Sequence, residues 1–233
     1  MAFSEDNLNT SAEQYEIKDS QDIQQYKNVV LGKNPVIEDF VLLGLVPRTK
    51  KVYRLVIGDD AFVRSHSVIY GGSKIGNNFQ TGHGVLIREN NTIGNNVSVG
   101  SHTVIEVENQ IGSNVRIHSN CFIPEFVFIE DDVWIGPSVT VLNVLHPPCP
   151  RFKDCAKHVR IKRNAKIGGN VTIGPRVTIG SNSLIGMGSV VTADIPDNVL
   201  AYGNPARVIK SIFELECDVG YFQIPYEWEE KDR

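Results

Sequence analysis

The chain has 233 residues, 41% of them hydrophobic, and a formal net charge of −4 with a pI near 5.9. Its length accommodates one large domain or two small ones with a real core. Nucleic acids and anionic membranes bind preferentially to basic protein surfaces, and this chain is acidic, so we expect neither as a partner. Four scattered cysteines, no apolar run of about 20 residues and no apolar leader segment predict a soluble, cytoplasmic protein with reduced thiols.

Residues 1–29 are polar, rich in Ser, Asp, Gln and Asn, and show no hydrophobic periodicity. Such a composition buries too little apolar surface to offset the entropy lost on ordering. We therefore expect these residues to form an N-terminal arm outside the folded domain.

From about residue 30 a branched aliphatic residue recurs at every sixth position, and Gly and Asn are frequent just after it. The period is clearest in the series Ile57, Val63, Ile69, Ile75, Thr81, Ile87, Ile93, Val99, Ile105, Ile111, Ile117, Ile123, Ile129, Ile135 and Val141. After a break the period resumes at Ile161 and continues to Val191. A helix needs a period of 3.6 and a flat strand a period of 2, so this period fits neither. The fourth residue after most of these aliphatics is also small or branched, so we expect two inward side chains in every six.

A coil of three short strands and three corners satisfies this period, with successive coils stacked as parallel strands about 4.8 Å apart. The repeat resembles that of the hexapeptide-repeat acyltransferases, whose fold is a left-handed parallel β-helix. The resemblance implies an all-β fold with about eight coils over residues 30–200 and a protruding loop at about 144–160. Residues 201–233 would then form a short C-terminal helix and an aromatic tail.

Histidines occupy several corners of the early coils. His66 and His102 are 36 residues apart, so they fall in one column, as in part of the zinc site of γ-class carbonic anhydrases. The position of the third ligand in that family is Val107, so this column lacks the full set. We expect His118, also at a corner, to be solvent-exposed.

His83 lies two residues after Thr81, the one member of the series that is not aliphatic. Several sugar and lipid acyltransferases of the family that the repeat resembles place a histidine base in this slot. An imidazole titrates near neutrality without tuning, so the resemblance makes His83 a candidate general base. A structural or substrate-positioning role stays open.

Glu125, in FIPEF, and Asn143, in VLNVL, each follow an inward residue by two positions and are 18 residues apart. We therefore predict that they stack on successive coils. The pair resembles that of nucleotide-linked amino-sugar N-acetyltransferases, in which the corresponding acid and amide face the sugar. A carboxylate can hold an ammonium and accept its proton, and an amide can bond the same nitrogen. A solvated Glu beside a corner Asn is the alternative.

Two further hypotheses rest on the break, VLHPPCPRFKDC. His146 followed by Pro147 resembles the catalytic His-Pro of galactoside and xenobiotic O-acetyltransferases, so a hydroxyl acceptor with His146 as its base stays open. His146, Cys149, Cys155 and His158 are ligand types acceptable to zinc, although five residues between the cysteines is unusual for a structural site. We predict a wall or lid and no metal site.

Residues 155–193 contain six basic residues and no Asp or Glu. Coenzyme A carries a diphosphate and a 3′-phosphate, which such a basic stripe would attract, while exposed backbone groups bind the pantetheine arm. A solvated basic face is the alternative. The cofactor-binding residues that we predict are Arg163, Ala165, Lys166, Gly168, Gly186, Arg207 and Lys210.

These features together predict an acetyl-CoA-dependent N-acetyltransferase that acts on the amino group of a nucleotide-linked amino sugar. The amine would attack the thioester directly, and proximity would supply much of the acceleration. The resemblance further implies a homotrimer with active sites between subunits. The alternatives are a sugar O-acetyltransferase that uses His146, a metal-binding or γ-carbonic anhydrase-like protein, and a non-catalytic scaffold of the same shape.

Overall fold

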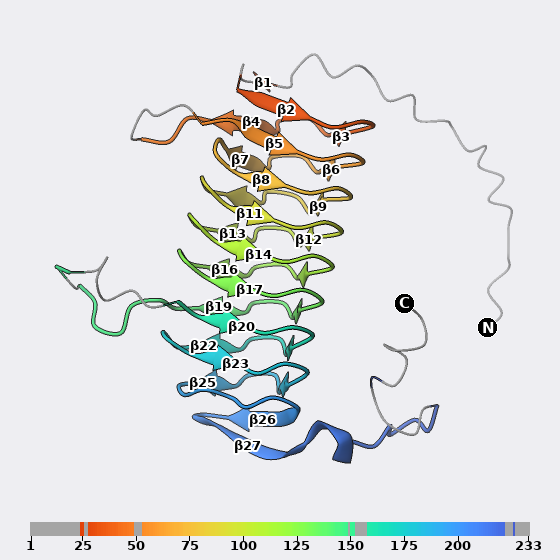
Figure 1. Ribbon diagram of the computed structural model, residues 1–233, viewed down its shortest axis with the longest axis vertical. Coiled ribbons are helices and arrows are strands. Elements are labelled where there is room, and N and C mark those ends of the chain that lie inside the picture. Colours follow the sequence, from red (N-terminus) through yellow and green to blue (C-terminus); the bar gives the residue numbers. More distant parts are fainter. Residues whose placement is uncertain are drawn as a thin grey trace, which may run out of the picture.

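A computed structural model describes residues 24–25, 28–48, 53–148, 150–151, 158–221 and 226. They form one long coil of short parallel strands (Figure 1). Each full coil gives one strand to each of three sheets, so strands three apart in the chain order are neighbours in space. The fold is the left-handed parallel β-helix that the six-residue period predicts.

The three sheets run along the whole coil. Sheet A contains β1 (Gln24–Gln25), β4 (Leu42–Leu45), β7 (Val68–Tyr70), β10 (Leu86–Ile87), β13 (Val104–Ile105), β16 (Phe122–Ile123), β19 (Thr140–Val141), β22 (Thr172–Ile173) and β25 (Val190–Val191). Sheet B contains β2 (Val29–Leu31), β5 (Leu55–Ile57), β8 (Lys74–Ile75), β11 (Thr92–Ile93), β14 (Gln110–Ile111), β17 (Phe128–Ile129), β20 (Arg160–Ile161) and β23 (Thr178–Ile179). Sheet C contains β3 (Val36–Ile37), β6 (Phe62–Val63), β9 (Gln80–Thr81), β12 (Ser98–Val99), β15 (Arg116–Ile117), β18 (Trp134–Ile135), β21 (Lys166–Ile167), β24 (Leu184–Ile185), β26 (Val199–Gly203) and β27 (Ala206–Ser211).

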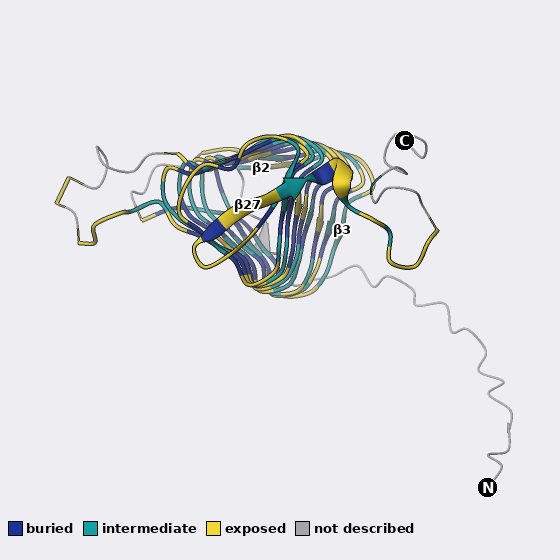
Figure 2. Ribbon diagram, turned by 90° about the horizontal axis from the view of Figure 1, so that it is seen from below, coloured by how far each residue is buried: buried dark blue, intermediate teal, exposed yellow. Residues whose placement is uncertain are grey.

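The register places equal positions of successive coils side by side. Ile87 pairs with Ile105, and Ile105 pairs with Ile123. These aliphatic residues and the small residues four positions later are buried, including Cys121 at 2% exposure. Figure 2, which looks along the coil, shows the buried residues of successive coils lying over one another. The predicted two inward positions in six are therefore confirmed.

Corners connect the sheets in a fixed order. We call them the A–B, B–C and C–A corners after the sheets that they join. Each turns through a residue of positive φ, such as Asn78 at 55° and Asn96 at 56°. The preceding glycines serve another purpose, because a Cβ on Gly94 would lie 2.7 Å from the carbonyl carbon of Gly112. Glycine therefore permits close stacking of coils, and asparagine makes the turn.

Both ends of the coil differ from the sequence-based boundaries. β1 lies within residues 1–29, so pairing begins before the predicted start of the domain. Residues 201–211, which we expected to lie in the helical C-terminal region, are strand: β26 extends sheet C beside β24 and turns back antiparallel into β27. This hairpin occupies hydrogen-bonding groups at the open end of sheet C. The short C-terminal helix is a single 3₁₀ turn, η1 (Ile212–Glu214).

The chain leaves the coil twice at the A–B corner, and both excursions project to the left in Figure 1. Residues 142–159, between β19 and β20, correspond to the predicted loop at 144–160. A second excursion, not predicted from the sequence, separates β4 from β5, and its described residues are 46–48 and 53–54. Within the part of the chain that the structure describes, no helix has the length and apolarity needed to cross a membrane.

Candidate functional site

Glu125 and Asn143 lie at the A–B corner, two residues beyond the ends of β16 and β19. The Asn143 side-chain amide donates a hydrogen bond from Nδ2 to Glu125 Oε2 at 2.6 Å. Both residues are half-buried. The predicted stacking is therefore confirmed. Asn143 Nδ2 also donates to the Glu125 carbonyl oxygen at 3.5 Å, so both contacts use the amide nitrogen and leave Asn143 Oδ1 and Glu125 Oε1 as acceptors for a ligand.

More charged residues stand on the same corner, one and two coils before Glu125. Arg88 donates two hydrogen bonds to Glu89, at 2.9 and 3.1 Å, and a third to Glu106 at 3.1 Å. The guanidinium also lies over the ring of Tyr70, with 5.3 Å between its Cζ and the ring centroid. This corner thus holds three carboxylates near one cation. Of these residues, the 18-residue spacing from Glu125 reaches only Glu89, two coils back; one coil back it reaches Val107, the neighbour of Glu106.

Burial raises the pKa of Glu106. The Arg88 guanidinium opposes the rise, whereas the carboxylates of Glu125 and Glu89 reinforce it. Glu106 is therefore close enough to Glu125 for their charges to interact. The corner favours an additional positive charge, because Arg88 pairs with Glu89 and Glu106 while Glu125 adds a third carboxylate close to Glu106.

His83 lies at the C–A corner, where its Nδ1 is 2.9 Å from Ser65 Oγ and 3.8 Å from Glu38 Oε2. Glu38 also accepts a hydrogen bond from the Ser65 amide at 2.9 Å. Thr81 has a structural reason for breaking the aliphatic series, because its Oγ1 accepts the amide N–H of Arg64 at 2.9 Å. Thr81 and His83, the two unusual residues of this segment, therefore each have a hydrogen-bond partner.

The structure does not bring His83 and Glu125 together. They stand at different corners, with sheet A between them. His83 precedes Glu125 by 42 residues, which at 18 residues a coil is about two and a third coils, or about 11 Å along the axis. Within one chain, a single bound amine would therefore face one of these two side chains and not the other. The base roles of His83 and Glu125 are therefore alternatives.

The other corner histidines have structural neighbours. His66 and His102 share a column at the C–A corner; His66 lies against Phe40, with 5.0 Å between ring centroids. His118 is half-buried, unlike its predicted exposure, and packs edge-on against Trp134. Burial and, secondarily, Arg116 lower the pKa of His118, and its buried Nε2 has no hydrogen-bond partner.

The loop at 142–159 is described at its two ends. His146 is exposed, three residues beyond Asn143. His158 Nδ1 is hydrogen-bonded to the carbonyl oxygen of Phe126 at 2.8 Å. Cys149 and Cys155 lie outside the described residues, so the zinc hypothesis for this loop stays untested. Among the described residues no group of three or more His, Cys, Asp and Glu side chains is arranged to hold a metal ion.

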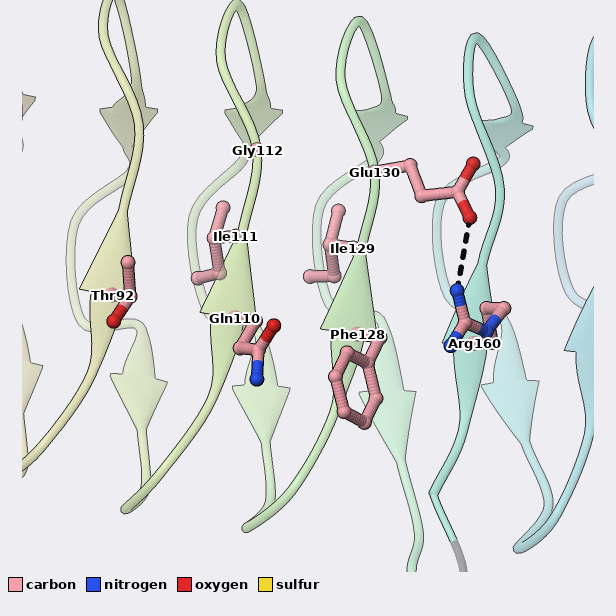
Figure 3. Close-up of a pocket in the computed structure, with 8 residues that line it drawn as sticks. All are labelled: Thr92, Gln110, Ile111, Gly112, Phe128, Ile129, Glu130 and Arg160. Carbon is pink, nitrogen blue, oxygen red and sulfur yellow. Dashed lines mark hydrogen bonds and ion pairs between the residues drawn. The ribbon is translucent and has the colours of Figure 1, made fainter.

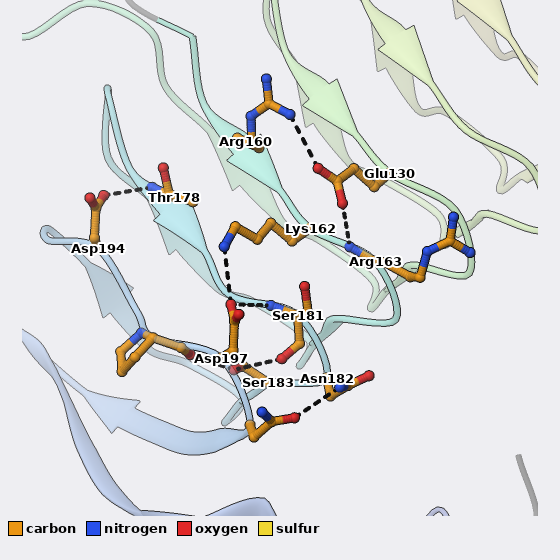
Figure 4. Close-up of polar contacts among 12 residues, drawn as sticks. Glu130, Arg160, Lys162, Arg163, Thr178, Ser181, Asn182, Ser183, Asp194 and Asp197 are labelled. Atoms are coloured by element: carbon orange, nitrogen blue, oxygen red, sulfur yellow. Dashed lines mark hydrogen bonds and ion pairs between the residues drawn. The ribbon is translucent and has the colours of Figure 1, made fainter. Parts of the chain in front are cut away.

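The predicted basic stripe is not isolated in space, because neighbouring coils supply acidic partners (Figure 4). Arg160 pairs with Glu130 at 3.1 Å. Lys162 pairs with Asp197 at 3.2 Å. The guanidinium of Arg163 bonds two adjacent carboxylates, those of Asp131 at 2.6 Å and Asp132 at 3.1 Å. The charge asymmetry along the sequence is thus largely balanced in the folded protein.

The remaining predicted cofactor residues lie at different places on the coil. Ala165 is 0% exposed, so its side chain is part of the core and only its backbone remains available. The Lys166 ammonium donates to Asn164 at 3.1 Å and lies 4.5 Å from the ring centroid of Tyr226 in the C-terminal tail. Arg207 donates to the carbonyl of Ala206.

Two of the predicted cofactor residues, Gly168 and Gly186, lie at the C–A corner of the last coils. The amide of Gly168 donates to the carbonyl of Ile185, as the coil ladder requires. Gly186 lines an open hollow with Met187 and Tyr202. Lys210, on β27, donates from its ammonium to the carbonyl of Glu214. Gly186 is therefore the predicted cofactor residue that lies in a surface hollow.

A second hollow, on the outer face of sheet B, was not predicted. It follows a row of outward side chains on β11, β14, β17 and β20: Thr92, Gln110, Phe128 and Arg160 (Figure 3). The 18-residue spacing would have found the first three. Arg160 is displaced from that spacing by the loop insertion.

Comparisons with known proteins point to the class that the fold and the repeat define, hexapeptide-repeat β-helix proteins. Residues 158–193 match the family model described as bacterial transferase hexapeptide, six repeats. A galactoside O-acetyltransferase from Lactococcus lactis subsp. lactis is 43% identical over 90 residues, which are 37% of this chain and 44% of that protein. The match thus spans less than half of that relative's length.

Two solved structures have similar folds over most of the chain. LpxA from Acinetobacter baumannii is 22% identical, with a TM-score of 0.61, and the match covers 82% of this chain and 72% of LpxA. The polySia-specific acetyltransferase NeuO is 25% identical, with a TM-score of 0.50, and the match covers 83% of this chain and 87% of NeuO.

Proposed function

We propose that this protein is an acetyl-CoA-dependent N-acetyltransferase that acts on the amino group of a nucleotide-linked amino sugar. The observation that carries the proposal is the contact of 2.6 Å between Asn143 Nδ2 and Glu125 Oε2 at a half-buried corner. It leaves one carboxylate oxygen and one amide oxygen available, the acceptors that an amine with several N–H groups requires. The names of the galactoside O-acetyltransferase and NeuO support acetyl transfer as the reaction class.

Direct transfer follows from this arrangement. The acceptor arrives as an ammonium ion, bound by Glu125 Oε1 and Asn143 Oδ1. Glu125 accepts one proton, and the free amine then attacks the carbonyl carbon of the acetyl thioester. The C–N bond forms, the C–S bond breaks, and the thiolate of coenzyme A leaves. The second nitrogen-bound proton that must be lost passes to the thiolate, directly or through water.

The charge of the corner favours an amine over a hydroxyl. Glu89, Glu106 and Glu125 outnumber Arg88, so a cationic acceptor gains electrostatic attraction that a neutral alcohol does not. This attraction raises the local concentration of a cationic acceptor at the corner. The enzyme is therefore saturated at a lower bulk concentration of acceptor.

Acetyl-CoA is the co-substrate in this proposal, and we place it on the last coils. Support comes from the hollow at Gly186, Met187 and Tyr202, whose bare glycine backbone can bond a pantetheine arm. Because acidic neighbours already pair with Lys162 and Arg163, phosphate binding at these two residues would require exchange of ion-pair partners. Arg207 and Lys210 bond only backbone carbonyls in the described contacts, so they are better placed to meet the phosphates.

A homotrimer with sites between subunits is part of the proposal. The outer row of sheet A is apolar over five successive coils: Leu42, Val68, Leu86, Val104 and Phe122. The matching rows of the other two sheets are polar in the middle coils: Lys74, Thr92 and Gln110 on sheet B, and Gln80, Ser98 and Arg116 on sheet C. A neighbouring subunit that covers sheet A would reach Glu125 and Asn143, which directly follow strands of that sheet.

A hydroxyl acceptor with His146 as base is the second candidate. The 43% identity to the galactoside O-acetyltransferase favours it. The two candidates differ in which residue must accept a proton, so one pair of variants separates them.

Glu125→Gln keeps the shape of the side chain and removes its basicity, so it should reduce kcat for an amino-sugar nucleotide by about a hundredfold or more. His146→Ala should change kcat much less. Release of free coenzyme A thiol measures both. Glu108→Gln, on an exposed Glu of the same corner, is the matched control for the loss of one charge. If His146→Ala alone abolished turnover, the amine mechanism at Glu125 would be wrong.

A further inference from the structure

The hollow on sheet B is lined by three kinds of functional group in one row: an amide, an aromatic ring and a guanidinium. Gln110, Phe128 and Arg160 project from the neighbouring strands β14, β17 and β20 (Figure 3). Neighbouring strands lie about 4.8 Å apart, so an amide, an aromatic ring and a guanidinium follow one another at that spacing. Gln110 and Arg160 are exposed, and Phe128 is half-buried.

Contacts within the row hold the guanidinium near the ring. The Cζ atom of Arg160 is 5.0 Å from the centroid of the Phe128 ring. Its Nη1 donates to Glu130 Oε1 at 3.1 Å, which leaves other N–H groups of the fork available. His158 packs edge-on against Phe128, with 5.0 Å between the ring centroids.

This set suits a nucleotide. Aromatic rings and guanidinium planes stack on nucleobases, and a side-chain amide can pair with the edge of a base. A guanidinium fork matches the oxygens of a phosphate. The row therefore offers a ring, an amide and a guanidinium along one hollow.

The hollow also lies within reach of the amine site. Phe128 follows Glu125 by three residues, so at most about 10 Å of extended chain separates them. The loop that begins at Asn143 returns to the coil at Arg160, and His158 anchors its end to Phe126. The amine site and the hollow therefore flank the base of one loop.

We propose that the sheet B hollow binds the nucleoside diphosphate of the acceptor, with the base over Phe128 and Gln110 and the phosphates at Arg160. The inference rests on the proposed function, because it is the sugar amine at Glu125 that ties the nucleotide to this side of the corner. Coenzyme A also contains a nucleoside diphosphate and is the competing source of the same chemistry.

Calorimetric titration separates the two sources. Thymidine, uridine and guanosine diphosphates, and separately coenzyme A, would be titrated into the wild type, Phe128→Ala, Arg160→Gln and Lys74→Ala. Lys74 has the same outward position on sheet B, three strands before Phe128, and its replacement also removes one positive charge. We expect at least one nucleoside diphosphate to bind the wild type, and Phe128→Ala to weaken it by about tenfold to a hundredfold.

Arg160→Gln should weaken the same ligand, whereas Lys74→Ala should not, and coenzyme A should bind all four proteins alike. The thermal unfolding midpoint shows whether each variant is folded; if Phe128→Ala is not, Arg160→Gln decides. The inference is overturned if no diphosphate binds the wild type, if neither variant weakens it, or if coenzyme A is weakened instead. Turnover of an amino-sugar nucleotide that survives Phe128→Ala with unchanged KM would overturn the inference alone, whereas diphosphate binding without turnover would overturn the proposed function alone.

Discussion

Single residues become neighbours in this protein through the 18-residue coil, and that rule succeeds only where no insertion intervenes. Glu125 and Asn143 are 18 residues apart and touch, so their contact was predictable from spacing. Arg163 instead meets Asp131, 32 residues earlier, because the loop adds 14 residues to that coil. Its neutralisation could not be predicted without knowing the register across the loop.

Glu106 gives a test at the residue scale. Because its pKa is raised above the ordinary value of 4.5, the folded protein binds more protons than the unfolded chain between the ordinary and the raised value. The contribution of Glu106 to stability is therefore lost as the pH rises through that window. Glu106→Gln, which mimics the acid form, should gain stability relative to the wild type as the pH rises from below 4.5 toward neutrality.

Urea unfolding of the two proteins at several pH values measures this difference. Glu108→Gln is again the matched control, since Glu108 is exposed on the same corner. A difference between Glu106→Gln and the wild type that stayed constant with pH would show that Glu106 is not held in the environment described.

Elements were predicted with uneven success, and the corners show why. The period of six identified the strands because each depends on one buried aliphatic residue. Glycine and asparagine both recur just after the aliphatic positions, yet their tasks differ: Asn96 has a φ of 56°, whereas Gly94 makes room for Gly112 on the next coil. The two roles can be distinguished only when the stacking of the coils is known.

The C-terminal hairpin was missed for a related reason. Residues 199–211 have no six-residue period and no clear alternation, so their local sequence does not distinguish a strand from a short helix. The open end of sheet C decides the outcome, because β26 pairs with β24 there. Local sequence carries no information about an unpaired edge created by the preceding coils.

At the scale of the whole molecule, the apolar outer row of sheet A gives a prediction about subunit assembly. Phe122 is 37% exposed in the single chain, in a row that is apolar on the preceding coils. Phe122→Glu would place a charge in the proposed subunit interface and should convert the trimer to monomers, because an unpaired buried charge is costly. Light scattering after size exclusion measures the mass.

Arg116→Glu is the control for this test, since it places a charge on the polar outer row of sheet C at a similar height. It should leave the mass unchanged. A trimer that survived Phe122→Glu, or a wild type that was monomeric, would exclude sheet A as the subunit interface.

The central claim is that the A–B corner receives an amine. It is tested most directly by comparing acetyl-CoA turnover on nucleotide-linked sugars that differ only in an amino or a hydroxyl group at the same carbon, linked to thymidine, uridine or guanosine diphosphate. Release of free thiol is the readout. We predict turnover of an amino sugar and none of its hydroxyl counterpart. Turnover of the hydroxyl sugars with no reaction of the amino sugars would contradict the account.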